Sequence, residues 1–459
     1  MKLPAVVACL VAVCPLASAE PQGPTRAILD ELVKVDTSHG NETKLLEPVK
    51  ARLAAAGIKG EIIESGPGRG NYIARIKGTG AKKPLILLAH VDVVPVEGQP
   101  WTTKPFTPTE KDGYLYGRGV NDDKAMASSI IVVAQELAKQ NPKPSRDVII
   151  MLTAGEETGG TVGVRWLVQH RKDLFGDAEI ALNEGGSLLL GSDGDVRSVG
   201  IGVAEKTFQS FRITVKGKGG HSSQPPTDGD AATTLAKALV QIGEHSFPMR
   251  LLPQVKDSLA HASQREKSPL GPALAHAVAS APKVAPADEK IIATDRTYNA
   301  LLRTTCVTTM LKGSPQDNVL PTEVEAIVNC RILPGETIPQ TQKTLSDLVH
   351  DPNVAITAYD EVGEGPIEEL GGDVPAAIKA AATKVFPTAH VVGTMSTGAT
   401  DSRHLRGAGI HSFGISTSVV VLDDVRKGLV AHGPDERRLV KWIDKGTDFL
   451  RAIVAELTR

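Results

Sequence analysis

Three apolar runs in the sequence are each followed by histidine or acidic residues, at the point where a buried strand is expected to end. In chain order they are residues 84–89 followed by His90 and Asp92, residues 148–152 followed by Glu156 and Glu157, and residues 178–182 followed by Glu184. Such runs are typical of strands buried in a mainly parallel sheet, where ligands bind at the carboxyl ends of the strands. Neighbouring buried acids are costly unless a cation lies nearby, and imidazole and carboxylate groups are zinc ligands. The repetition predicts a metal site at this edge of the sheet.

Two further stretches offer ligands of the same kind. Asp122 and Asp123 precede a helix predicted over residues 125–139, and His432 precedes the last predicted helix, over residues 439–457. Each has an ordinary interpretation as well, because carboxylates cap the starts of helices and a histidine ahead of a helix is often a cap or a solvated residue. Taken one at a time, these residues leave both interpretations open.

Asp92 lies two residues after His90, so the two side chains point to the same side of an extended backbone. From there the Asp92 carboxylate can hold one ring nitrogen, which leaves the other nitrogen for a metal ion. The sequence has no GxxxxGK[ST] loop, and Gly117 and Gly119 are not followed by the remainder of a dinucleotide-binding motif. The motifs therefore favour metal chemistry over nucleotide binding.

The chain of 459 residues is long enough for two domains. Its 51 Lys and Arg residues nearly balance its 53 Asp and Glu residues, and aromatic residues make up 3% of the chain. Neither a nucleic-acid surface nor a base-stacking platform is expected from this composition.

Residues 1–19 are typical of a signal peptide, with an apolar run after Lys2 and a small-residue cleavage site that ends at Ala19. The apolar run is too short to span a bilayer. We expect a secreted or periplasmic protein with no stable membrane anchor, cleaved near Ala19. The mature chain would then keep two cysteines, Cys306 and Cys330, which either pair in an oxidising compartment or remain as small buried thiols.

Hydrophobic periodicity divides the mature chain into two kinds of structure. Residues 20–204 alternate helical and apolar-strand patterns, and the same pattern resumes over residues 364–459. Between them, residues 205–363 follow the order strand, helix, strand, strand, helix, strand, with period-two alternation in the strands. The prediction is an α/β domain with a mainly parallel sheet and helices on both faces, interrupted by an inserted α+β, ferredoxin-like domain. Residues 251–295 are interpreted as an elaboration within the insertion.

Together these motifs resemble the zinc-dependent superfamily of aminoacylase, carboxypeptidase G, succinyl-diaminopimelate desuccinylase and carnosinase, over essentially the whole mature chain. The Asn-Glu-Gly-Gly motif at residues 183–186, the long insertion and the loop at residues 101–106 are most similar to the carboxypeptidase S and N-acyl-amino-acid hydrolase branch. The resemblance implies a di-zinc exopeptidase domain with an inserted lid or dimerisation domain, and two Zn²⁺ per chain, with Co²⁺ or Mn²⁺ as alternatives. The implied ligands are His90, Asp122 and Glu184 for one zinc, and Asp122, Glu157 and His432 for the other.

The resemblance also assigns roles around these ligands. It implies that Asp92 orients the His90 ring, that Glu156 is the general base, and that a cis peptide bond follows Asp122. Close relatives often have Asp where this chain has Asn183, and we choose its neighbour Glu184 as the ligand because of its charge.

Other residues match positions that contact substrate in relatives. His221, in a Gly-Gly-His-Ser-Ser loop, matches a histidine that reaches the active site of a dimer partner and supplies an oxyanion donor; its ordinary interpretation is an exposed loop histidine. A homodimer through the inserted domain is therefore a further expectation. The implied substrate-binding residues are Asn318, Arg331, Thr400 and Arg403, among which an arginine would grip a free carboxylate.

The resulting hypothesis is a secreted di-zinc hydrolase that cleaves an amide bond next to a free carboxylate in a small peptide or N-acyl amino acid. It would act as a carboxypeptidase, a dipeptidase or an N-acyl-amino-acid hydrolase. An aminopeptidase of the same fold is the first alternative, which Arg331 opposes because a substrate ammonium needs an acidic or polar anchor. A non-catalytic peptide-binding relative is the second, and the complete ligand set opposes it.

Overall fold

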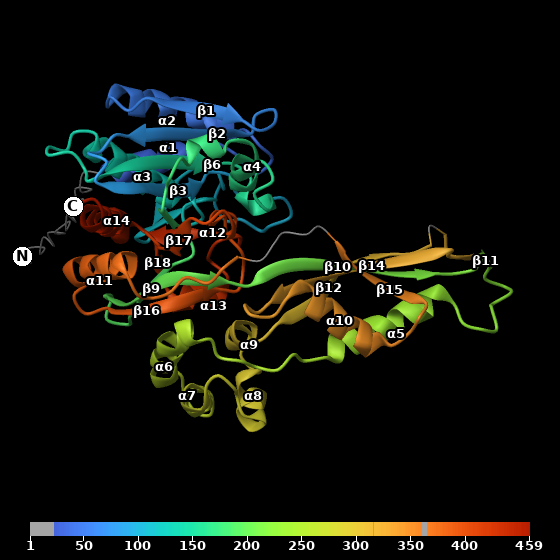
Figure 1. Cartoon of the computed structure of the whole chain (residues 1–459). Coiled ribbons are helices and arrows are strands. Elements are labelled where there is room, and N and C mark those ends of the chain that lie inside the picture. The colour runs from blue at the N-terminus through green and yellow to red at the C-terminus, as the bar shows by residue number, and fades with distance from the viewer. Residues whose placement is uncertain (1–22, 315, 360–364) are drawn as a thin grey trace, which may run out of the picture.

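The computed structural model describes residues 23–314, 316–359 and 365–459, and they form two lobes (Figure 1). One lobe is built on a ten-stranded sheet and contains both ends of the described chain. The other is an elongated arm on a four-stranded sheet. The predicted signal peptide lies outside the described residues. No helix among those residues is long and apolar enough to cross a membrane.

The large sheet has the strand order β1-β2-β6-β3-β7-β17-β9-β8-β18, and β16 pairs with β9 beside this path. Its strands are β1 (Gly60–Glu64), β2 (Gly70–Ile76), β3 (Lys82–His90), β6 (Arg146–Thr153), β7 (Ile180–Asn183), β8 (Ser187–Leu190), β9 (Val196–Glu205), β16 (His390–Ser396), β17 (His411–Gly414) and β18 (Val419–Val420). The central strands β6, β3, β7 and β17 run parallel to one another. Since parallel strands end at the same edge, the polar residues that follow β3, β6 and β7 are brought together.

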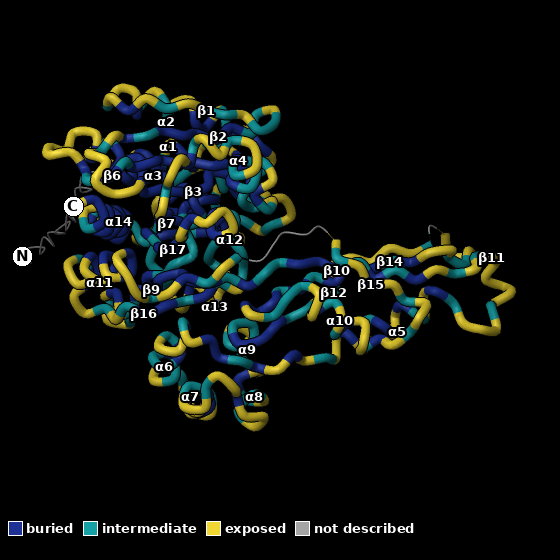
Figure 2. Tube along the Cα trace, viewed as in Figure 1, coloured by how far each residue is buried: buried dark blue, intermediate teal, exposed yellow. Residues whose placement is uncertain are grey.

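Helices cover both faces of this sheet, as predicted. Alternate residues of β3 face opposite sides: Leu85 and Leu87 belong to one apolar core, and Ile86 and Leu88 to another. The first core is completed by α1 (Pro24–Val33), α2 (Glu42–Ala55), α3 (Lys124–Leu137), α11 (Asp373–Val385) and α14 (Ile443–Leu457). The second is completed by α4 (Val164–His170) and α12 (Ser402–Gly407). The central strands are buried on both faces (Figure 2), which is why their sequences are continuous apolar runs.

The arm contains an antiparallel sheet of order β12-β14-β10-β15. Its strands are β10 (Thr207–Lys216), β12 (Thr305–Lys312), β14 (Glu323–Ile332) and β15 (Val354–Tyr359), packed against α5 (Ala231–Glu244) and α10 (Ile338–Val349). Cys306 of β12 and Cys330 of β14 face each other and form a disulfide. At the far tip of the arm, the short strands β11 (Gly220–His221) and β13 (Val319–Leu320) pair (Figure 1).

The segment interpreted as an elaboration of the insertion forms a small helical subdomain with its own core. It comprises α6 (Lys256–Arg265), α7 (Leu270–Ser280), α8 (Pro286–Ile292) and α9 (Arg296–Leu302). Its core also includes Ala204 and Met395 of the large lobe, and Leu333 next to the arm sheet. The subdomain therefore packs against both lobes where they meet.

A third sheet, of three short strands, joins distant parts of the large lobe. Its order is β19 (Arg437–Leu439), β5 (Tyr114–Tyr116) and β4 (Thr109–Lys111). Beside it lies the short helix α13 (Leu422–Lys427), and four 3₁₀ turns complete the described elements: η1 (Glu156–Thr158), η2 (Lys172–Leu174), η3 (Pro253–Val255) and η4 (Val440–Trp442). This small sheet fixes the segment after His432 against the loop that precedes Asp122.

Candidate metal centre and active site

His90, the last residue of β3, is held in one orientation by Asp92. The ring Nδ1 lies 3.1 Å from the Asp92 carbonyl oxygen and 3.3 Å from its Oδ1, and both residues are buried. The Asp92 carboxylate also accepts hydrogen bonds from the backbone N–H groups of Glu156 and Glu157, each at 3.2 Å. One carboxylate therefore joins the ends of β3 and β6. With Nδ1 held by Asp92, the Nε2 atom of His90 faces the other acidic residues.

Asp122 lies between the two histidines. Its Oδ1 is 2.9 Å from His90 Nε2, and its Oδ2 is 3.2 Å from His432 Nε2. The peptide bond between Asp122 and Asp123 is cis, as expected from the family resemblance. His432 Nε2 also lies 3.0 Å from Glu157 Oε1. A single carboxylate thus presents one oxygen to each of two groups of ligand atoms.

Glu184 completes the cluster on the His90 side. Its Oε1 lies 3.8 Å from His90 Nε2. The neighbouring Asn183 is buried and directs its amide to Thr400 and Ser402 instead, at 3.4 and 3.1 Å. Of the two residues between which the sequence left a choice, Glu184 is the one in the cluster.

The donor set fits divalent cations. Two groups of residues each bring their potential ligand atoms within 4.8 Å of one another. The first group is His90, Glu156 and Glu184, and the second is His90, Asp122 and Glu157. Two ligands that each lie roughly 2.0–2.2 Å from a tetrahedral zinc are about 3.3–3.6 Å apart. The contacts of 2.9–3.8 Å around Asp122 and His90 bracket that spacing.

The charges of the cluster show the same need for a cation. Burial raises the pKa of both Glu156 and Glu184 well above the usual range, and neighbouring carboxylates add to the effect. Hydrogen bonds to Asp122 and Glu157 raise the pKa of His432 to about 10. Burial lowers the pKa of His90, but hydrogen bonds to Asp122 and Asp92 outweigh it, so this pKa is also raised. In the absence of metal the cluster must hold protons to balance its negative charge, and a divalent cation would replace them.

A cavity of about 450 Å³ opens on one side of this cluster. Glu156, Glu157 and His432 line one wall. The other residues that line it include Arg165, Phe208, Arg331, Gly398, Ala399 and Arg403. The Arg331 guanidinium carbon lies 4.7 Å from the centre of the Phe208 ring. Arg331 and Arg403 line the same cavity, and burial and then the charge of Arg403 lower the pKa of Arg331.

Other residues expected to contact substrate lie elsewhere in the chain. His221 and Asn318 are exposed together at the tip of the arm, far from the cluster of their own chain (Figure 1). Thr400 is buried, and both its hydroxyl and its backbone N–H donate to Glu205, at 2.8 and 2.7 Å. The cavity beside Glu156 thus contains Arg331 and Arg403 of the four predicted substrate contacts.

The sequence of residues 86–456 matches the model of peptidase family M20/M25/M40. This chain belongs to that family. It is 29% identical over 364 residues to the N-fatty-acyl-amino acid synthase/hydrolase PM20D1 of Xenopus tropicalis, covering 77% of this chain and 68% of the relative. It is 27% identical over 375 residues to a probable carboxypeptidase S-like protein 2 of Dictyostelium discoideum, covering 80% and 70%. The protein is therefore a hydrolase of this metallopeptidase family.

Solved structures share the fold of this M20 chain. A metallo-carboxypeptidase of Sulfolobus solfataricus superposes with a TM-score of 0.71 at 19% identity, covering 95% of this chain and 99% of the other. Human carnosine dipeptidase 1 superposes with a TM-score of 0.68 at 16% identity, covering 95% and 96%. Both the sequence and the fold thus agree with the family resemblance inferred from the motifs.

One buried ion pair beneath the M20 centre was missed by the sequence analysis. The carboxylate of Glu436 is fully buried, and it accepts hydrogen bonds from Arg118 Nη1 at 2.9 Å and from the backbone N–H groups of Asn121 and Asp122 at 2.8 and 3.3 Å. Arg118 Nη2 in turn lies 3.4 Å from the carbonyl oxygen of His432. The pair therefore ties together the two loops that carry Asp122 and His432.

The backbone at His432 needs this support. Its φ of +68° lies in the left-handed region, which a non-glycine residue adopts only where surrounding contacts require it. A second hydrogen bond, from Gln99 Nε2 at 2.9 Å, also reaches the His432 carbonyl oxygen. The only signal that the sequence offered is that Arg118 and Glu436 each lie within four residues of a predicted ligand, in stretches that resemble solvated loops.

Proposed function

We propose that this M20 hydrolase holds two zinc ions and cleaves an amide bond next to a free carboxylate, as a carboxypeptidase, dipeptidase or N-acyl-amino-acid hydrolase. The observation that supports this most directly is that Glu156 lines the same cavity as two of the assigned ligands, Glu157 and His432, and as the arginines Arg165, Arg331 and Arg403. The ligands we assign are His90, Asp122 and Glu184 for one ion, and Asp122, Glu157 and His432 for the other.

Bound at these residues, zinc supplies Lewis-acid chemistry, which polarises an amide carbonyl and allows water to be deprotonated near neutral pH. We assign Glu156 as the general base. It accepts a proton from the attacking water and donates it to the nitrogen of the leaving amine as the C–N bond breaks. The neighbouring Glu157 stays with the metal and His432, which explains why two adjacent glutamates are needed.

The substrate carboxylate is assigned to the arginine side of the cavity. Arg331 and Arg403 offer planar guanidinium groups that bind a carboxylate with two parallel hydrogen bonds. An aminopeptidase would need an anionic anchor at the same place for the substrate ammonium. The names of the relatives, which include an N-fatty-acyl-amino acid hydrolase and a carboxypeptidase, agree with a substrate that keeps a free carboxylate.

We propose that the inserted arm acts as a lid and dimerises, so that His221 and Asn318 reach the active site of a second copy. Strand β12 lies at the edge of the arm sheet, and three of its large apolar residues are exposed: Val307 by 61%, Met310 by 64% and Leu311 by 71%. A sheet edge with apolar side chains favours pairing with another chain. Closure would take place at the chain crossing near residue 205; the second crossing, predicted near residue 363, lies outside the described residues.

We also propose that the protein is secreted or periplasmic after cleavage near Ala19. The Cys306–Cys330 disulfide supports this, since structural disulfides persist mainly in oxidising compartments.

The function is tested by amino-acid release from three matched substrates by the zinc-loaded mature protein: a free dipeptide, its N-acetylated form and its C-amidated form. We expect the acetyl group to be tolerated and the amide to be rejected, because only the first leaves the carboxylate free. The opposite pattern would indicate an aminopeptidase and refute the proposal.

Two arginine variants give this test a residue-level form. A charge-assisted hydrogen bond contributes about 1.5–3 kcal/mol, so Arg331→Met is expected to raise KM for the substrate with a free carboxylate by about 10- to 150-fold. Arg212→Met is the matched control, because Arg212 lies on β10 next to β14 and pairs with Glu325, outside the cavity. Equal KM values for the two variants would show that Arg331 does not bind the carboxylate.

A further inference from the structure

We propose that a second pocket, which is lined by both apolar and polar residues and includes Asp122 and Glu184 of the ligand cluster, binds the aliphatic acyl chain of an N-acyl amino acid along its apolar residues. The inference rests on the proposed function and makes its substrate class more specific. It starts from how the cluster is divided between two cavities. Asp122 and Glu184 line the second pocket, whereas Glu156, Glu157 and His432 line the cavity with the arginines.

The division fixes the direction of a bound substrate. An amide held at the cluster has one substituent on each side, and each substituent must enter a different cavity. The arginine cavity suits a carboxylate, so the amino-acid half belongs there. The other half of the substrate, the acyl group, then enters the pocket that begins at Asp122 and Glu184.

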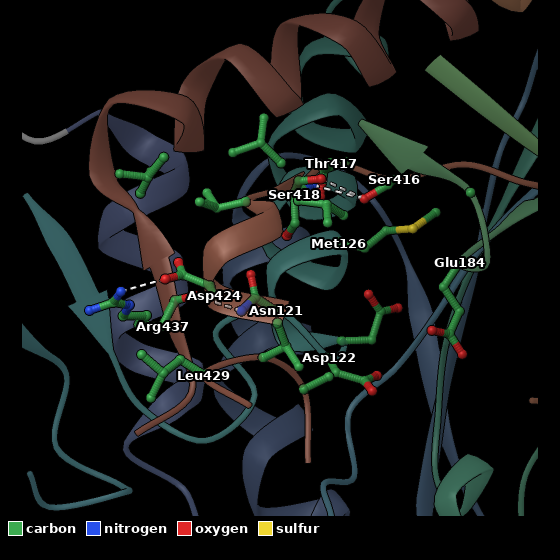
Figure 3. Close-up of a pocket in the computed structure, with 18 of the residues that line it drawn as sticks. Asn121, Asp122, Met126, Glu184, Ser416, Thr417, Ser418, Asp424, Leu429 and Arg437 are labelled. Atoms are coloured by element: carbon green, nitrogen blue, oxygen red, sulfur yellow. Dashed lines mark hydrogen bonds and ion pairs between the residues drawn. The ribbon is translucent and has the colours of Figure 1, made fainter. Parts of the chain in front are cut away.

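The composition of this pocket suits a hydrocarbon. Its volume is about 250 Å³. The apolar residues that line it come from several distant segments: Met126, Ile415, Val419, Val420, Val421, Leu429, Val430, Ala431 and Leu439. In Figure 3, Met126 lies between Glu184 and the segment that contains Thr417 and Ser418. Polar residues line the pocket as well, namely Asn121, Asp123, Ser416, Thr417 and Ser418. A hydrocarbon chain would therefore lie along the apolar residues, with its amide next to the charged cluster.

An ion pair closes the far side of the pocket. Asp424 and Arg437 form an ion pair there, opposite Glu184 (Figure 3). The Arg437 guanidinium also lies over the Tyr114 ring, 4.1 Å from its centre, and donates to the Tyr116 hydroxyl at 2.9 Å. Because Asp424 and Arg437 satisfy each other, this end presents no free charge to a ligand, and it sets a limit to the length of chain that the pocket accepts.

The proposal predicts how affinity depends on chain length. Burial of one methylene group is worth about 0.8 kcal/mol, which corresponds to a factor of about four in affinity. Each added methylene is therefore expected to lower Kd about fourfold until the chain meets the Asp424–Arg437 pair, after which Kd levels off or rises.

The experiment measures binding and turnover with N-acyl derivatives of one amino acid, with linear acyl chains from acetyl upward. Kd is measured by calorimetry on zinc-loaded Glu156→Gln protein, and kcat/KM on the native protein. A fall in Kd with chain length supports the pocket whether or not the native protein turns the compounds over. A Kd that does not change with chain length overturns it. Binding without turnover would instead refute the proposed function, so the two failures are distinguishable.

Two variants locate the effect. Leu429→Trp places a large side chain in the pocket and is expected to remove the dependence on chain length. Val425→Trp is the control, because Val425 is exposed on α13 and does not line the pocket. A dependence that persists in Leu429→Trp overturns the assignment. Compounds with an α-amino group on the same acyl chain form the last arm, and binding that requires this amino group would overturn the acyl assignment in favour of a dipeptide.

Discussion

Replacing Glu436 by glutamine is expected to weaken both the fold and metal binding, although Glu436 is not assigned as a ligand. The Glu436 carboxylate has four hydrogen-bond donors around it: Arg118 Nη1 and the backbone N–H groups of Gly119, Asn121 and Asp122. Two of them reach Oε1 and two reach Oε2. A glutamine amide keeps one oxygen, so two donors would face an NH₂ group that cannot accept a hydrogen bond.

The magnitude follows from burial. Arg118 is 1% exposed and Glu436 is 0% exposed, so the substitution leaves a guanidinium without its counter-charge inside the protein. Breaking a buried ion pair costs about 3–5 kcal/mol. Because Glu436 and Arg118 also position Asp122 and the His432 backbone, zinc affinity is expected to fall about 10- to 100-fold, the usual effect of losing a residue that orients metal ligands.

The assay combines urea unfolding of the metal-free protein with zinc competition against a chromogenic chelator. Glu136→Gln is the matched control, because Glu136 pairs with Arg451 at 2.6 Å on the surface, where both side chains are more than 40% exposed. A surface pair contributes about 0–1 kcal/mol, and this one is far from the centre. If Glu436→Gln and Glu136→Gln matched each other in unfolding free energy and zinc affinity, the reasoning would be refuted.

Three further outcomes are expected. Glu156→Gln should lower kcat by about 10²–10⁴-fold, while its metal content, measured by atomic emission, stays unchanged. A decrease in kcat of less than tenfold would contradict the role of Glu156 as general base. His221→Ala and Glu156→Gln chains should each be inactive, yet regain activity when mixed under conditions that exchange subunits, whereas a mixture that stays inactive would exclude action across a dimer. Burial, followed by the charge of Arg403, lowers the pKa of His404 to about 3. Below pH 6.5 the His404 side chain therefore binds a proton in the unfolded chain but stays neutral in the folded chain. The stability that this difference contributes above pH 6.5 is lost as the pH falls toward 3. The free energy of unfolding of His404→Gln should therefore fall less between pH 7 and pH 5 than that of the native protein. Parallel curves of unfolding free energy against pH would contradict this.

The cluster of candidate metal ligands was predictable because its geometry follows from a local rule. Strands β3, β6 and β7 are continuous apolar runs, and parallel pairing aligns their carboxyl ends. Any polar residue directly after such a run is therefore near the others. His90 and Glu184 illustrate this, since they are far apart in the sequence but belong to the same group of potential ligands.

The supporting contacts depend on long-range pairing that no local pattern carries. Glu436 lies in a run of charged residues that resembles a solvated loop, and it is buried only because Arg118, 318 residues earlier, meets it. The predicted helix over residues 439–457 begins later in the structure, at Ile443, because Leu439 pairs with Tyr114 in the three-stranded sheet. In both cases a tertiary partner overrides the local preference.

The position of β17 in the large sheet has a consequence for biosynthesis. This strand, residues His411–Gly414, lies between β7 and β9, two strands that are made much earlier. While the ribosome is still translating the arm, β7 therefore has an unpaired edge, and the sheet that carries the candidate ligands is incomplete. A nascent or C-terminally truncated chain exposes that edge to other chains, so proteolytic loss of the last segment would favour aggregation over the release of a smaller working enzyme.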